Sequence, residues 1–373
     1  AGIDNTGLID EYLRMGKAQN SKEFESALKM MQIPMFNIIY ADNDGNIFYF
    51  FNGNVPVRNE GDFGFWKGTI DGTQSKLIWN KTHSYNDLPK LLNPSTGFIQ
   101  NCNDAPWSCT YPFVLKPEDF PAYMSSRSFT LRPQRAVNML KDDKAITFDK
   151  LVEYKQNTEM EAARRFLDDL LKAVENHPDS IALQAAEVLK KWDMKTETTS
   201  KGALLFAAWW DKIKPDMIKT PWNKNEPVST PKGLKDEKQA VELLVKAYQE
   251  TVKKYGTADV GWGEVHRFAA GNLNFPANGG PGDHYGLFRT IYYTDIPGNK
   301  KAAVAGETFI AAVEFGSTQK AMVSLSYGNA TQPGNKHAGD QLADLSAKKL
   351  RPALLTREAV LQNLEKREIP GNK

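Results

Sequence analysis

The order of the secondary-structure patterns along this 373-residue chain is the feature that most constrains its fold. Strand-like runs dominate the first third of the sequence, helical periodicity dominates the middle, and strand-like runs return near the C-terminal end. Strands, then helices, then strands predict an α+β fold. We therefore expect one folded unit made of three segments: residues 1–132, which are strand-rich, residues 133–256, which are helical, and residues 257–373, with antiparallel strands and a C-terminal helix.

Several segments have patterns specific enough to assign. Residues 5–32 predict two helices, the second capped by Ser21. Asp44-Gly45 lies between apolar runs within residues 36–51 and predicts a β-hairpin. Further helices are expected near residues 133–141, 147–156, 158–176, 179–192, 200–214 and 235–254, and further strands at 76–79, 287–293, 309–315 and 320–325.

Composition and motifs exclude several classes of function. The chain has 47 basic and 45 acidic residues, so nothing in its charge predicts nucleic acid as a partner. No apolar run approaches the roughly 20 residues that span a bilayer. No signal peptide is visible at residue 1, which in a fragment says nothing about export. A Gly-x-Ser-x-Gly elbow, which a Ser-His-Asp hydrolase would need, is absent. We therefore interpret His266, His284 and His337 as structural residues or residues at the rim of a site.

Neither the cysteines nor the acidic residues predict a metal site. Cys102 and Cys109 lie seven positions apart and lack a metal-binding spacing. A disulfide between them and a pair of free thiols both remain open. Asp42 and Asp44 resemble part of a calcium loop, but the twelve-residue pattern ending in Glu is missing. These residues predict a hairpin turn, and we expect no cofactor and no metal.

The most specific functional signal lies in residues 97–107, Gly-Phe-Ile-Gln-Asn-Cys-Asn-Asp-Ala-Pro-Trp. Asn101 and Asn103 are two positions apart, so an extended segment would point both amides to the same side. A rigid Asn at the end of a strand can donate its NH₂ group to a developing oxyanion, which is worth about 3–4 kcal/mol of barrier. The alternative is a turn rich in Asn and Asp that only caps a strand.

Other blocks occur in a specific order around this segment. They are Tyr40-Ala41-Asp42-Asn43-Asp44-Gly45-Asn46-Ile47, Gly261-Trp262-Gly263-Glu264-Val265-His266-Arg267, Gly306-Glu307-Thr308-Phe309, Tyr327-Gly328-Asn329-Ala330 and His337-Ala338-Gly339-Asp340-Gln341. Together with Gln-Asn-Cys-Asn-Asp at 100–104, they resemble the penicillin-amidase family of N-terminal-nucleophile hydrolases. The resemblance covers nearly the whole chain and is strongest to the branch of homoserine-lactone and aculeacin acylases.

The resemblance implies an αββα sandwich, of which this chain would supply the later part of the β subunit. The family nucleophile is a Ser at the first position of that subunit, whereas residue 1 here is Ala1. We therefore expect the chain to lack the nucleophile, to be inactive alone, and to pair with a missing N-terminal part or α subunit of the same precursor. A homodimer is a further expectation, and a structural calcium, found in some relatives, stays open.

By the same resemblance, Asn103 matches the oxyanion-hole Asn of the family, and Asn101 would be structural. Arg132 would support Asn103 from the rim of the site, and an alignment shifted by three residues would give that role to Arg135. The structural alternative is a pair of first-turn arginines beside the helix-starting Pro133.

The implied function is that of an amide-bond acylase acting on a small acylated amide, such as an acyl-homoserine lactone or a penicillin, through an N-terminal Ser acyl-enzyme. The resemblance implies a periplasmic or secreted enzyme with a role in quorum quenching or antibiotic catabolism. A catalytically inactive binding or structural relative is the alternative. Phe50, Phe51 and Trp107 are candidates for an apolar acyl pocket, and core packing explains them nearly as well.

Overall fold

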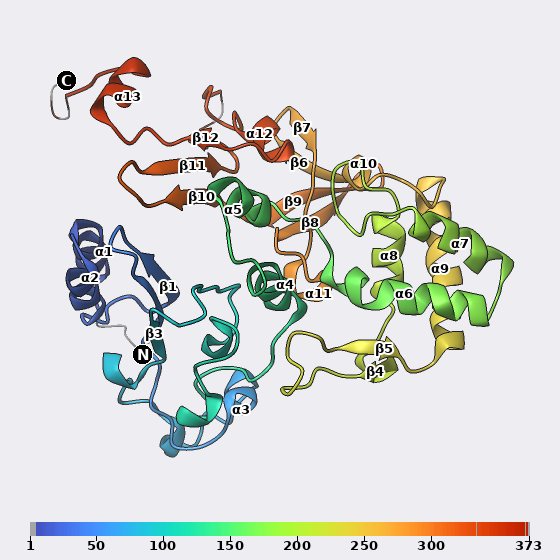
Figure 1. Ribbon diagram of the computed structural model, residues 1–373, viewed down its shortest axis with the longest axis horizontal. Helices are drawn as coiled ribbons and strands as arrows, with labels where there is room; N and C mark the ends of the chain where they lie inside the picture. Colours follow the sequence, from blue (N-terminus) through green and yellow to red (C-terminus); the bar gives the residue numbers. More distant parts are fainter. Residues whose placement is uncertain (1–4, 333, 370, 372–373) are drawn as a thin grey trace. The chain divides into compact units, whose positions relative to one another are not determined.

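The computed structural model describes residues 5–332, 334–369 and 371. Ala1, on which the expected absence of the nucleophile rests, lies outside these residues. The contacts group the chain into two compact units. Figure 1 labels the helices and strands and colours them along the sequence from blue to red. The first unit comprises Ala1–Lys144 and Ile218–Gly233, and the second comprises Ala145–Met217 and Leu234–Lys373. The division into three sequence segments stays a prediction.

The first unit contains short helices, a hairpin-based sheet and long irregular connections. Its elements are α1 (Leu8–Lys17), α2 (Ser21–Leu28), β1 (Met35–Ala41), β2 (Ile47–Gly53), α3 (Phe63–Lys67), β3 (Lys90–Leu92), α4 (Leu131–Leu140) and β4 (Ile218–Thr220). β4 pairs with β5 (Lys232–Leu234), which ends at the boundary between the units.

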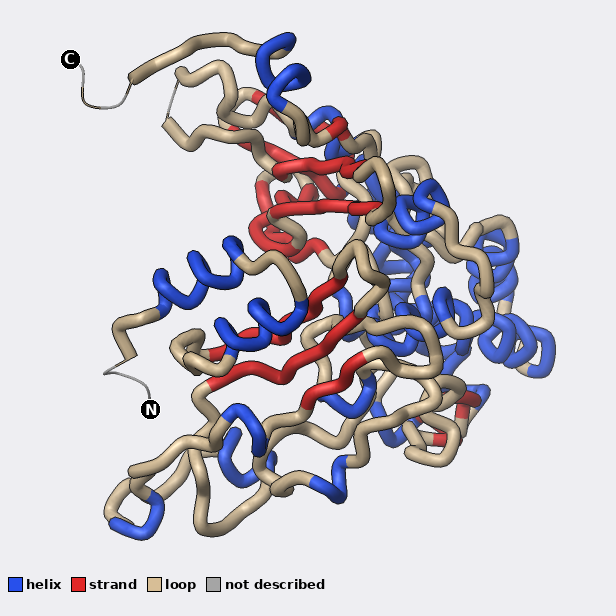
Figure 2. Tube along the Cα trace, turned by 60° about the vertical axis from the view of Figure 1, so that its left-hand side comes forward, coloured by secondary structure: helices blue, strands red, loops and turns tan. Residues whose placement is uncertain are grey.

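The sheet β1-β2-β3 forms the core of the first unit. Both strand pairs are antiparallel, and α1 and α2 cover one face of the sheet (Figure 2). The core contains Leu28 from α2, Ile38 from β1 and Phe50 from β2. The predicted hairpin is confirmed: Ala41 pairs with Ile47, and the turn between them is closed by backbone hydrogen bonds.

The second unit begins with α5 (Phe148–Lys155), which is followed by four helices that pack against one another. These are α6 (Glu161–Asn176), α7 (Ser180–Lys190), α8 (Ala203–Trp210) and α9 (Glu237–Tyr255). α8 has the sequence ALLFAAWW and is apolar on all sides, which is typical of a helix buried among others. It packs against α7 and α9, and the Trp209 Nε1–H donates to the Ala240 carbonyl oxygen at 3.0 Å.

Two small sheets complete the second unit. Its remaining elements are α10 (Trp262–Val265), β6 (His266–Ala270), β7 (Leu273–Pro276), α11 (Gly282–Tyr285), β8 (Ile291–Ile296), β9 (Lys300–Gly306), β10 (Phe309–Glu314), β11 (Lys320–Leu325), α12 (Leu342–Ser346), β12 (Arg351–Pro352) and α13 (Arg357–Gln362). The strand orders are β7-β6-β9-β8 and β10-β11-β12. One core cluster joins both sheets to α12, through residues such as Phe268, Ile310 and Leu342. No helix among the described residues is long and apolar enough to span a bilayer.

Most predicted elements are confirmed within a few residues, and the exceptions have local causes. Residues 76–79 do not form a strand, because this stretch has no pairing partner and turns as the 3₁₀ helix Ser75–Leu77. Asn20, and not Ser21, caps α2, since its side chain accepts the Glu23 N–H. Antiparallel pairing joins β8 (Ile291–Ile296) to β9 (Lys300–Gly306) and β10 (Phe309–Glu314) to β11 (Lys320–Leu325), whereas β6 (His266–Ala270) pairs in parallel with β9.

Glu11 is a buried carboxylate in the first unit. It lies on α1, is fully buried, and accepts hydrogen bonds from the backbone N–H groups of Gln32 at 2.5 Å and Ile33 at 3.1 Å. Burial raises the pKa of Glu11 above its ordinary value of 4.5, although both hydrogen bonds oppose this shift.

The raised pKa of Glu11 predicts a pH-dependent stability. The folded chain keeps its proton at a pH where the unfolded chain has lost it, so ionisation of Glu11 lowers the free energy of unfolding as pH rises above 4.5. Glu11→Gln cannot ionise and keeps an acceptor oxygen. In urea titrations, the unfolding free energy of Glu11→Gln minus that of the wild type should therefore increase as pH rises from 4.5 to about 7. Asp10→Asn, at an exposed position of α1, is the control. If the difference in unfolding free energy from the wild type is independent of pH for both variants, the prediction is contradicted.

Candidate active site

A buried carboxylate organises the segment that carries the two candidate asparagines. Asp104 accepts the Cys102 backbone N–H at 2.7 Å, the Ser108 hydroxyl, and the Gln100 side-chain amide at 3.3 Å. Burial raises the pKa of Asp104, against the effect of these three hydrogen bonds. The backbone N–H of Gln100 also donates to the Cys109 carbonyl at 2.8 Å, which closes residues 100–109 into a compact corner.

Asn103 lies at the exposed tip of this corner. Its φ of +63° is in the left-handed region, which Asn tolerates better than most residues. The Asn103 backbone N–H donates to Asn101 Oδ1 at 2.8 Å, and Asn101 Nδ2 donates to the Asp104 carbonyl at 3.3 Å. The prediction of an extended segment with both amides on one side is therefore wrong. The side chain of Asn101 closes a turn, and only the Asn103 side chain projects from it.

Arg132 contacts the side chain of Asn103 directly. It is the second residue of α4, and its Nη1 donates to Asn103 Oδ1 and to the Cys102 carbonyl oxygen, each at 3.1 Å. The guanidinium group therefore occupies the acceptor end of the Asn103 amide. Among the described residues nothing accepts a hydrogen bond from Asn103 Nδ2, which leaves this NH₂ group available as a donor. The other alignment candidate, Arg135, is buried within α4.

The cysteines and the aromatic candidates have different environments. Cys102 and Cys109 are both buried, and no disulfide joins them in the described part of the chain. Burial raises the pKa of the Cys109 thiol to about 12. Phe50 belongs to the core of the first unit, with Phe51 packed against it. Trp107 is buried next to the Asn103 corner and lines a cavity.

The structure places the three histidines in structural settings in the second unit. His266 is buried and stacks on the Trp262 indole, with a ring-centroid separation of 3.8 Å. His284 Nε2 lies 2.9 Å from Asp211 Oδ1. His337 Nδ1 lies 2.8 Å from Asp340 Oδ2, which fixes the 337–341 loop as expected.

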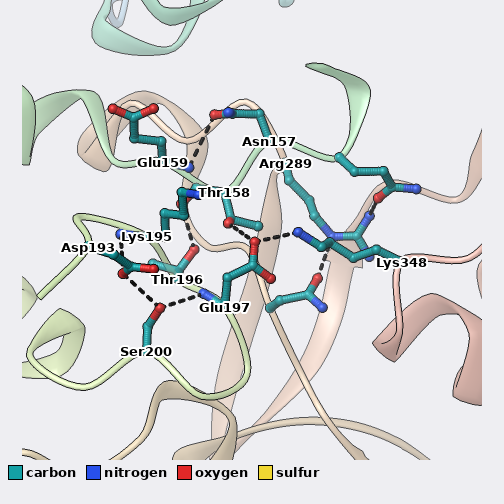
Figure 3. A network of polar contacts seen from close by, with 12 residues as sticks. Asn157, Thr158, Glu159, Asp193, Lys195, Thr196, Glu197, Ser200, Arg289 and Lys348 are labelled. Atoms are coloured by element: carbon teal, nitrogen blue, oxygen red, sulfur yellow. Dashed lines mark hydrogen bonds and ion pairs between the residues drawn. The ribbon is translucent and has the colours of Figure 1, made fainter. Parts of the chain in front are cut away.

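A second polar network lies around Arg289 and Glu197 (Figure 3). Arg289 is fully buried, donates to Asn278 Oδ1 and to the Leu345 carbonyl, and forms an ion pair with Glu307. Glu197 accepts from the Thr158 hydroxyl at 2.6 Å and pairs with Lys348. Sequence reasoning missed this network, whose members are far apart in the chain. It satisfies buried charges, and we interpret it as structural.

The acidic hairpin turn satisfies its carboxylate from within. Asp42 Oδ1 accepts the backbone N–H groups of Asp44 and Asn46 at 3.0 and 2.9 Å, and Oδ2 accepts the Tyr40 hydroxyl at 2.8 Å. No group of three or more His, Cys, Asp or Glu side chains suited to a metal ion occurs within residues 5–332, 334–369 and 371.

Comparison with known proteins establishes the family. The profile of the family described as penicillin amidase matches residues 1–362. This chain belongs to the penicillin amidase family. The acyl-homoserine lactone acylases PvdQ of Pseudomonas putida and Pseudomonas fluorescens are both 23% identical to it, over 99% and 93% of this chain. The matches cover 50% and 48% of those proteins, so the chain spans about half the length of these curated relatives.

A solved structure shows the same fold. The thermostable penicillin G acylase of Alcaligenes faecalis superposes with a TM-score of 0.61 at 16% identity, over 97% of this chain and 72% of that one. An α+β fold resembling penicillin acylase is thereby confirmed. The αββα sandwich and the assignment to one part of a β subunit remain predictions.

The buried imidazole of His266 predicts sensitivity to acid. Burial lowers the pKa of His266 to about 3, so the unfolded chain binds this proton more readily, and stability present above 6.5 is lost as pH falls toward 3. Each pKa unit corresponds to about 1.4 kcal/mol. His266→Phe keeps a ring to stack on Trp262 but cannot take up a proton. Its unfolding free energy, measured by urea titration, should fall less steeply than that of the wild type below 6.5, and parallel curves would contradict this.

Proposed function

We propose that this chain forms part of an amide-bond acylase, in which Asn103 donates a hydrogen bond to the oxyanion and Arg132 positions Asn103. Membership of the penicillin amidase family supports this proposal, as do relatives named as acyl-homoserine lactone acylases and a penicillin G acylase with the same fold. The substrate class is a small acylated amide. An N-terminal Ser on polypeptide other than residues 1–373 would supply the nucleophile.

The contact between Arg132 and Asn103 carries the proposal. A primary amide can rotate its oxygen or its NH₂ group toward a reacting atom, and only the NH₂ group stabilises an anion. The Arg132 guanidinium donates to Asn103 Oδ1, so rotating the amide would replace this charge-assisted hydrogen bond with two facing donors. The NH₂ group is thereby held in the orientation that an oxyanion requires.

The reaction proceeds in two balanced steps. The Ser hydroxyl oxygen attacks the amide carbon, its proton passes to the α-amine of the same Ser, and the carbonyl oxygen becomes an oxyanion that accepts from Asn103 Nδ2. The carbon–nitrogen bond then breaks, and the leaving amine takes the proton. Water hydrolyses the acyl ester, which releases a carboxylic acid and restores the Ser hydroxyl.

The edge of the first unit's sheet indicates where further polypeptide would pair. Within the described residues β1 pairs only with β2, so its other edge is open. Met35, Phe36 and Ile39 on β1 are 73%, 59% and 48% exposed. An open edge with apolar side chains is a typical site for adding a strand. We propose that the N-terminal part of the same precursor pairs here; homodimerisation and a periplasmic or secreted location remain predictions.

Substitution of Asn103 tests the catalytic part of the proposal. In the protein produced from its complete gene, Asn103→Ala should lower kcat for an acyl-homoserine lactone or penicillin by about 10²–10³, with a much smaller change in KM, because the lost donor acts in the transition state. Arg132→Lys should give a smaller loss of kcat, since it retains the charge but not the planar donor group.

Asn225→Ala is the matched control, because Asn225 is an exposed asparagine of the first unit and lies outside the corner. A folded Asn103→Ala protein with unchanged kcat would exclude the oxyanion role. A wild-type protein that hydrolyses neither substrate class would favour the inactive binding relative.

A further inference from the structure

A cavity of about 700 Å³ in the first unit lies beside the segments that carry Asn103 and Arg132. Its walls come from three parts of the chain: residues between 105 and 118, residues 127–129, and residues 220–224. The first part begins within the corner that carries Asn103, and the second ends two residues before α4 begins. The Trp107 Nε1–H donates to the Ser126 carbonyl at 2.7 Å and holds these two walls together. The volume is in the range of sites for small organic ligands.

The interior walls of the cavity are aromatic. Trp107 and Phe129 are buried, and Phe113 packs edge-on against Phe129 with ring centroids 5.5 Å apart. Trp222 is half-buried, and its Nε1–H donates to the Pro227 carbonyl at 3.2 Å, so its polar atom is already satisfied. These rings offer contact to an apolar chain or ring and little hydrogen bonding.

The charged residues that line the cavity are mostly basic. Lys116, Arg127 and Lys224 are exposed lining residues, whereas Glu118 is the single acidic residue of the lining. Within the described part of the chain, none of the three basic side chains takes part in a salt bridge. The lining therefore combines an apolar interior with a net charge of about +2, in which the cations are available to an anion.

We propose that this cavity binds a small amphipathic carboxylate, that is, an apolar chain or aryl group that ends in a carboxylate. The apolar part would contact the aromatic walls, and the carboxylate would lie among Lys116, Arg127 and Lys224. A neutral amphiphile would lose the charge interaction, and a cationic one would be repelled. The charge complementarity of the lining selects this occupant over those alternatives.

Calorimetric titration of the protein produced from its complete gene with simple acids tests the proposal. Hexanoate, octanoate and decanoate should bind with affinity that rises about threefold to fourfold for each methylene that becomes buried. Octylamine, which has the same chain and the opposite charge, should bind about tenfold more weakly than octanoate or worse, and added salt should weaken octanoate binding. These acids contain no amide bond, so the result is independent of hydrolysis.

Charge-reversal variants assign the binding to this cavity. Arg127→Glu combined with Lys224→Glu should weaken octanoate binding by about tenfold or more. Lys67→Glu, at an exposed position of α3 in the same unit, reverses one charge away from the cavity and should leave the affinity within about twofold. Circular dichroism and urea titration check that each variant folds. Absence of octanoate binding, equal affinity for octylamine, or unchanged binding by the double variant would each overturn the proposal.

Discussion

The position of Asn103 depends on hydrogen bonds that hold its turn and its amide oxygen. Asn101 Oδ1 accepts the Asn103 backbone N–H, and Arg132 donates to Asn103 Oδ1. The Asp104 carboxylate accepts hydrogen bonds from the Cys102 backbone N–H on one side of the turn and from the Ser108 hydroxyl on the other. A left-handed conformation costs a residue roughly 1–2 kcal/mol. Hydrogen bonds to charged groups contribute about 1.5–3 kcal/mol each, so those to Arg132 and Asp104 are sufficient to offset that cost. The corner can therefore hold one amide rigidly at an exposed position.

The sequence predicted those features that local patterns determine. Apolar periodicity located α5–α9, and Asp44-Gly45 located the first hairpin. The sequence did not predict the conformation at Asn103, because the hydrogen bond from the Asn103 backbone N–H to the Asn101 side chain competes with the extended backbone that alternation suggests. Arg132 became a candidate only through the family resemblance, since 29 residues separate it from Asn103 and periodicity cannot show such a contact.

Features assembled from distant segments were beyond the reach of sequence reasoning. The cavity brings residues 220–224 against residues 105–118, and the Arg289 network joins residues 133 positions apart. The Pro- and Lys-rich stretch at residues 214–234 predicts a surface connection. That Trp222 within it forms a wall of the cavity depends on tertiary packing. The comparison establishes the family, and the acyl group and amine of the proposed reaction would depend on such packed surfaces.

The most direct test of the central claim is a crystal structure of the protein produced from its complete gene, with a boronic acid bound covalently to the proposed nucleophile. The tetrahedral boronate places an oxygen where the oxyanion forms. If Asn103 is the oxyanion donor, its Nδ2 should lie about 2.7–3.1 Å from that oxygen, with Oδ1 still bound by Arg132. A boronate oxygen held by other donors, with the Asn103 amide turned away from it, would contradict the account.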